Sequence, residues 1–215
     1  FPTRRSSDLL RPADPDLLTD SDTWLYLVNY FGQLTREEIL EWSRRQPRLI
    51  VDNAQAYFDA PLPGVNTLYT CRKFLGVADG GFLYTDAPLP ELEEDRSHGR
   101  MGFVLGRFED SAGAYFEEAS RNNDSLSPEA RAMSPITRNL LRAVDYDRVR
   151  TSRTENYRML HEALGGINLL AVRPVEGAYA YPLRLEGAQT LRRRLIGQKI
   201  FVPQQIGRAS CRERV

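Results

Sequence analysis

A strand–helix–strand pattern early in this 215-residue chain is the feature that most restricts its fold. Residues 24–30 are apolar and aromatic, which predicts a buried strand, and residues 48–51 predict a second strand. Between them, Thr35-Arg36-Glu37-Glu38 matches the capping box with which a helix begins. This order implies two parallel strands joined by a right-handed crossover.

Two further strand-type segments, Thr67–Thr70 and Gly81–Thr85, are joined by a loop that ends in the tight-turn sequence Asp79-Gly80-Gly81. Residues 10–95 therefore predict an α/β unit with a mixed, mainly parallel sheet. Ligands of such sheets bind at the carboxyl ends of the strands. Asn29, Tyr30 and Asp52 are expected there, although Asn29 and Tyr30 fit equally well as residues that close the strand.

The second half of the chain predicts a small α+β domain over residues 96–205. Helical patterns run from about 101 to 123 and from 134 to 164, where Gly165-Gly166 is a helix-ending signal. A β-β-α-β pattern follows, in residues 167–172, 179–185, from 188 onward and 200–202.

The two ends of the chain have related coding sequences. Phe1–Leu9 can be encoded by TTC CCT ACA CGA CGC TCT TCC GAT CT, and the reverse complement of that string encodes Ile206–Glu213. Unrelated protein termini have no reason to be reverse complements, and the string resembles a common sequencing adapter. We therefore expect residues 1–9 and 206–215 to be adapter-derived, and the chain to be an internal fragment.

Charge and composition exclude several classes of protein. The two ends hold five of the 29 basic and two of the 29 acidic residues, which leaves 24 basic and 27 acidic residues and a net charge of −3. This mild acidity argues against nucleic acid or an anionic membrane as a partner. No apolar stretch approaches the roughly 20 residues of a membrane span. Without the ends, Cys71 is the single cysteine, which suits a reducing, cytoplasmic location.

Few side chains are candidates for chemistry. The chain has two lysines, Lys73 and Lys199, beside 27 arginines. Lys199 follows a basic helical segment and is expected to be a solvated cation near the negative end of the helix dipole. His98 and His161 lack metal-ligand partners at a suitable spacing, so no metal site is expected.

Asp52, Gln55 and Lys73 form the most informative combination. A buried carboxylate at a strand end can keep a pyridine nitrogen protonated, and a lysine amine can carry pyridoxal 5′-phosphate (PLP) as a Schiff base. Taken singly, Asp52 fits a turn residue, Gln55 a group that satisfies local backbone, and Lys73 an exposed loop lysine. Together, and ahead of a Gly-rich turn, they favour a cofactor site.

The sequence resembles the DegT/DnrJ/StrS family of fold-type I, PLP-dependent sugar aminotransferases over roughly residues 10–205. The family has an Asp-x-x-Gln motif after an apolar strand, then the cofactor lysine and a Gly-Gly turn. Further similarity lies in Val28–Gln33, Arg153-Thr154-Glu155-Asn156-Tyr157, Tyr181-Pro182-Leu183 and Ile200–Pro203. One departure is Val51 before Asp52, where the family has Glu.

The resemblance implies a partial large PLP-binding domain in residues 10–95 and an incomplete small domain in residues 96–205. It implies that Lys73 binds PLP covalently, that Asp52 binds the pyridine nitrogen and that Gln55 binds the ring oxygen. Thr70 is a substitute for the family's phosphate-binding serine, whose usual position holds Leu68. Arg153, Asn156 and Tyr157, at positions i, i+3 and i+4 of one helix, are expected to pack the small domain on the large one.

The implied reaction transfers an amino group from glutamate or glutamine to a keto sugar, nucleotide-linked in the family. The implied assembly is a homodimer with a shared active site, so this chain alone is expected to be inactive. Two alternatives stay open. One is a PLP-dependent sugar dehydratase of the same fold, against which Lys73 argues because histidine replaces the lysine there. The other is a non-catalytic regulator or scaffold.

Overall fold

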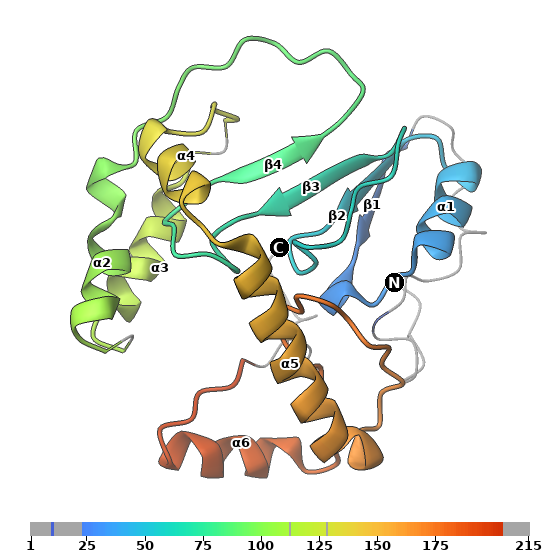
Figure 1. Cartoon of the computed structure of the whole chain (residues 1–215), viewed down its shortest axis with the longest axis vertical. Coiled ribbons are helices and arrows are strands. Elements are labelled where there is room, and N and C mark those ends of the chain that lie inside the picture. The colour runs from blue at the N-terminus through green and yellow to red at the C-terminus, as the bar shows by residue number, and fades with distance from the viewer. Residues whose placement is uncertain (1–9, 11–22, 112, 128, 204–215) are drawn as a thin grey trace.

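The computed structural model describes residues 10, 23–111, 113–127 and 129–203, so the ends predicted to be adapter-derived lie outside the described residues. One mixed sheet organises the chain, in the order β1-β2-β3-β4 (Figure 1). Its strands are β1 (Leu25–Val28), β2 (Leu49–Asp52), β3 (Asn66–Thr70) and β4 (Gly81–Tyr84). The first three are parallel, and β4 runs antiparallel to β3. The predicted mixed, mainly parallel α/β sheet is confirmed.

Helix α1 (Arg36–Arg45) forms the crossover between β1 and β2. The predicted capping box is present: the Thr35 hydroxyl accepts from the Glu38 N–H (3.2 Å), and the Glu38 carboxylate accepts from the Thr35 N–H (2.8 Å). The short helix η3 (Tyr30–Gly32) turns the chain from β1 toward α1. A core between α1 and one face of the sheet contains Leu27, Leu34, Ile39, Leu49, Val51, Leu62 and Val65.

The opposite sheet face is open over the described residues, which corrects the prediction of a fully buried first strand. Trp24 is 54% exposed, Tyr26 53% and Leu83 44%. Alternate residues of a strand point to opposite faces, so Leu27 enters the core while Tyr26 does not. An apolar run alone does not say whether a strand is covered on one face or on both.

The two predicted long helical segments are each divided in two. The first contains α2 (Gly102–Glu109) and α3 (Phe116–Ser125), and the second α4 (Pro135–Arg142) and α5 (Tyr146–Leu164). Helix α5 restarts at Asp145, whose carboxylate accepts from the Arg148 N–H (2.9 Å). In Figure 1, α2, α3 and α4 lie beyond the start of β4, and α1 lies at the other side of the sheet. Short helices η4 (His98–Arg100) and η5 (Gly165–Ile167) complete this part.

The three strands predicted after residue 166 do not form in the described part of the chain, although the helix predicted between them does, as α6 (Ala188–Gly197). Pro182 has no N–H to give to a ladder. The Asn168 side chain forms hydrogen bonds with backbone groups that a neighbouring strand would otherwise pair. Its Oδ1 accepts from Leu170 N (3.1 Å) and Arg184 N (3.0 Å), and its Nδ2 donates to Pro182 O (2.9 Å). A second, α+β domain is thus not evident in the form predicted.

Within the described ranges, no helix combines the length and apolar character needed to cross a membrane.

Candidate functional site

Asp52 ends β2 at the carboxyl edge of the parallel strands. Its Oδ1 accepts from the Ala54 N–H (2.7 Å), which anchors the carboxylate in a tight turn. The residue is half-buried rather than buried as predicted. The Tyr26 hydroxyl lies against the carboxylate: burial, then the charge and the hydrogen bond of Asp52, raise the pKa of Tyr26 to about 12. Asp52 is therefore both a turn residue and a charged group on the open sheet face.

Lys73 lies in the loop between β3 and β4, and the structure brings it within electrostatic reach of Asp52. Partial burial lowers the pKa of the Lys73 ammonium; the Asp52 carboxylate opposes this shift and the Arg72 guanidinium adds to it. The ammonium also lies 5.8 Å from the centre of the Tyr179 ring. The two residues that the sequence singled out thus share one neighbourhood. The Lys73 side chain is exposed, as the alternative of a loop lysine predicts, while its amine is partly desolvated.

Gln55 and Asn29 have clear backbone roles. Gln55 Oε1 accepts from the Phe31 N–H (3.2 Å), where the backbone of Phe31 has a positive φ of 55°. Asn29 is fully buried; its Nδ2 donates to Asn53 Oδ1 (3.0 Å), and its Oδ1 accepts from Leu34 N (2.9 Å). For Asn29 the structure favours closing the strand over lining a site. For Gln55 the contact with the ring oxygen stays a prediction.

Thr70 ends β3 and pairs with Gly81 across the hairpin. It is two residues beyond Leu68, which pairs with Asp52, so Thr70 and Asp52 belong to the same face of the sheet. This placement is compatible with the phosphate contact that the resemblance implies for Thr70. Tyr30 lies in η3 and is half-buried.

A strap formed by residues 173–181 borders the site. Tyr157 Oη donates to Arg173 O (2.7 Å), and Gln33 Oε1 accepts from Arg173 N (2.8 Å). On the same helix α5, Arg153 Nη2 donates to Phe74 O (3.1 Å), next to Lys73. Tyr157 Oη also accepts from Gln33 Nε2 (3.4 Å). Arg153 and Tyr157 therefore pack the later part of the chain on the earlier part, across the predicted boundary at residues 95 and 96, whereas Asn156, the third residue expected to do so, is exposed.

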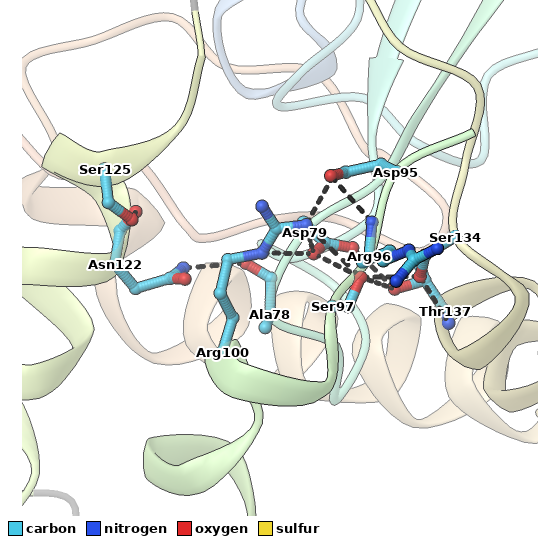
Figure 2. A network of polar contacts seen from close by, with 10 residues as sticks. All are labelled: Ala78, Asp79, Asp95, Arg96, Ser97, Arg100, Asn122, Ser125, Ser134 and Thr137. Atoms are coloured by element: carbon cyan, nitrogen blue, oxygen red, sulfur yellow. Dashed lines mark hydrogen bonds and ion pairs between the residues drawn. The ribbon is translucent and has the colours of Figure 1, made fainter. Parts of the chain in front are cut away.

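A buried polar cluster holds the other end of the Lys73 loop (Figure 2). We call it the Asp79 cluster. Asp79 Oδ2 accepts from Ser97 Oγ (2.7 Å) and Arg100 Nε (3.0 Å), and its Oδ1 accepts from Thr137 Oγ1 (2.5 Å). Because the single Ser97 hydroxyl hydrogen goes to Asp79, Ser97 Oγ accepts from Ser134 Oγ (2.5 Å). The carboxylate is saturated with donors and joins the hairpin to η4 and α4.

Sequence reasoning missed both Tyr26 and the Asp79 cluster. Tyr26 could have been found from the parallel register. Tyr26 pairs with Ile50, two residues before Asp52, so Tyr26 and Asp52 belong to the same face of the sheet. Asp79 was interpreted only as part of a tight turn. Its partners lie 18, 21 and 58 residues away, and no local pattern connects residues at such separations.

A cleft of about 860 Å³ lies elsewhere, between α1 and the strap, and neither Asp52 nor Lys73 lines it. We give the chemistry of the two residues more weight than the cleft, because the cleft's Arg173 already donates to the carbonyls of Gly32 and Leu34. Across the described part of the chain, no group of three or more His, Cys, Asp and Glu side chains is placed to hold a metal ion.

Comparisons of the chain with protein-family models, with curated proteins and with solved structures find no match.

Proposed function

We propose that this protein is a PLP-dependent aminotransferase that moves an amino group from glutamate or glutamine to a nucleotide-linked keto sugar. One observation supports the proposal above all others. Asp52 and Lys73, 21 positions apart, share the carboxyl edge of a parallel sheet, where ligands of such sheets bind. They supply the acid and the amine that the cofactor requires.

The residues present fit the cofactor in a defined way. Asp52, held by the Ala54 N–H, would accept from a protonated pyridine nitrogen in a charge-assisted hydrogen bond. Lys73 would form the covalent bond, while Thr70 and Gln55 would contact the phosphate and the ring oxygen. For Gln55 the contact would come from the amide Nε2, because its carbonyl oxygen already accepts from Phe31 N. When bound, PLP supplies an electron sink for the substrate's Cα.

Lys73 has two tasks in this proposal. Its lowered pKa leaves more of the amine unprotonated near neutral pH, which makes it a better nucleophile. Once released, the same amine can accept the proton from the amino donor's Cα as a general base. The aromatic side chains exposed on the open sheet face, Trp24 and Tyr26, offer an apolar surface for the proposed second subunit.

The test is covalent trapping. The chain is incubated with PLP, reduced with borohydride and digested, and the pyridoxyl-lysine is located by mass spectrometry. We expect modification of Lys73 in preference to Lys199, which serves as an internal control because it is the only other lysine. Lys73→Arg should remove the adduct, and Asp52→Asn should reduce its yield while leaving some binding. A folded protein modified equally at both lysines, or at neither, would point to the non-catalytic alternative.

A further inference from the structure

The loop that carries Lys73 is closed at its base. Cys71 N donates to Gly80 O (3.0 Å), directly beyond the pair formed by Thr70 and Gly81. Residues 71–80 are therefore tied together at both ends, and Asp79 lies next to the tie. Any displacement of Asp79 must also move the base from which Lys73 projects.

Inside the loop, burial decides which side chains face outward. The N–H groups of Phe74 and Leu75 both donate to Cys71 O (3.0 and 2.9 Å), which makes one helical turn. Cys71, Phe74 and Leu75 point into a core that includes Leu141 of α4. The turn consequently presents Lys73 on its outer side, toward Asp52 and Tyr179.

Helix α4 holds the same loop a second time, by polar contacts. The Thr137 hydroxyl donates to Asp79 (2.5 Å), and a Cβ added to Gly80 would lie 2.8 Å from Thr137 Cγ2. Arg100 of η4 contributes the charge that balances the buried Asp79 carboxylate, at 2.8 Å. The loop is thus packed and hydrogen-bonded to one helix and ion-paired to another element.

We infer that Asp79 is a positioning residue for Lys73: its hydrogen bonds to Thr137, Ser97 and Arg100 hold the loop so that the Lys73 amine faces Asp52. Asp79 does not touch the reacting atoms, because its oxygens are occupied by these donors. The part of the inference that concerns the cofactor rests on the proposed function. The part that concerns the amine does not.

The consequence is measurable at Lys73 itself. The groups that face its amine are Asp52, Arg72 and Tyr179. If the loop loosens, the partly desolvated amine gains water and its pKa rises toward that of a fully solvated lysine. If the cluster only added stability, its loss would lower the free energy of unfolding without changing the pKa of Lys73 in the folded protein.

The experiment is competitive acetylation of the two lysines with acetic anhydride over a pH series, which yields the titration midpoint of each amine without any cofactor. In the unmodified chain we expect the midpoint of Lys73 to lie below the ordinary value for a lysine amine. Asp79→Asn and Thr137→Val should raise the Lys73 midpoint and leave that of Lys199 unchanged. Thr137→Ser keeps the hydroxyl and should stay close to the original midpoint.

Arg138→Gln is the matched control, because Arg138 follows Thr137 on α4 but pairs with the exposed Glu94 (2.7 Å). It should leave the Lys73 midpoint unchanged. Circular dichroism selects the folded variants, and the Thr137→Val and Thr137→Ser pair keeps the test valid if Asp79→Asn fails to fold. Folded Asp79→Asn or Thr137→Val protein with an unchanged Lys73 midpoint would overturn the inference.

A second readout separates this inference from the proposed function. The rate of PLP trapping at Lys73 should fall at least about tenfold in Asp79→Asn, as expected when a reacting group is misplaced by a fraction of an ångström to one ångström. If the original chain forms no adduct at Lys73 while the acetylation midpoints shift as expected, the cofactor proposal fails and the positioning role stands. If PLP is trapped equally fast in both proteins, the positioning role fails and the cofactor proposal stands.

Discussion

At the scale of single residues, Gly80 shows how closely the Lys73 loop is packed. Gly80 has a φ of +94°, a conformation that costs a residue with a side chain roughly 1–2 kcal/mol. Its neighbour Gly81 is equally constrained, because an added Cβ would lie 2.6 Å from Tyr69 O. The Gly-Gly pair is therefore required both by a backbone conformation and by a close approach.

Gly80→Ala is expected to destabilise the protein by more than about 2 kcal/mol, because backbone strain and a clash with Thr137 add. Urea unfolding followed by circular dichroism measures this loss. Gly64→Ala isolates the backbone effect, since Gly64 has a φ of +77° but nothing within 4 Å of an added Cβ. Gly76→Ala, with neither constraint, should be neutral or slightly stabilising. If Gly80→Ala and Gly64→Ala lost the same free energy of unfolding, the structure would have shifted to relieve the clash with Thr137.

At the scale of elements, α1 is a helix whose start the sequence predicted correctly. Thr35 and Glu38 satisfy each other's N–H groups, as a capping box requires. The helix then buries Ile39 against β1 and β2. Local chemistry sets the first residue of α1, and packing against the sheet sets its direction.

Thr35→Ala should cost about 1 kcal/mol of folding free energy, because the Glu38 N–H loses its acceptor. Thermal or urea unfolding detects this change. The control is Ser43→Ala in the same helix: the Ser43 hydroxyl donates to Leu40 O (2.9 Å), and alanine has the higher helix propensity. We expect Ser43→Ala to be neutral or stabilising. If Thr35→Ala were as harmless as Ser43→Ala, the capping box would not stabilise α1.

At the scale of the whole molecule, Arg173 connects the strap to the loop after β1. Its guanidinium donates to the carbonyl oxygens of Gly32 (2.5 Å), Gln33 (3.3 Å) and Leu34 (2.9 Å). The planar guanidinium of arginine spreads its N–H donors over separate nitrogens, whereas the three donors of a lysine ammonium share one nitrogen and do not reach the same three carbonyls. The contacts join segments about 140 residues apart and border the site of Asp52 and Lys73.

Arg173→Lys is expected to lower the free energy of unfolding by about 1–3 kcal/mol, since hydrogen bonds from a charged donor are lost to partly buried carbonyls. Hydrogen exchange should increase in residues 30–34 and 173–178 more than in β2. Arg150→Lys is the control, because Arg150 forms an exposed ion pair with Asp147 at 3.1 Å and such pairs contribute little. If hydrogen exchange in residues 30–34 and 173–178 of Arg173→Lys were the same as in the original protein, the role of the strap would be contradicted.

The sequence by itself determined the elements whose causes are local. The capping box predicted the start of α1, the apolar runs predicted β1 and β2, and the Asp79-Gly80-Gly81 turn predicted the hairpin between β3 and β4. It also selected Asp52 and Lys73, because few residue types can perform the expected chemistry. The predicted elements are confirmed because each depends on residues close together in the chain, whereas the chemistry expected of Asp52 and Lys73 stays a prediction.

Only the tertiary structure decided which faces are buried and which distant groups meet. It exposed Tyr26 beside Asp52, gave Asp79 its partners Ser97, Arg100 and Thr137, and left the strands predicted after residue 166 unformed in the described residues. Strand pairing and the burial of a carboxylate depend on partners that are remote in sequence. Their free energies are set when the elements pack together, and no local pattern records them.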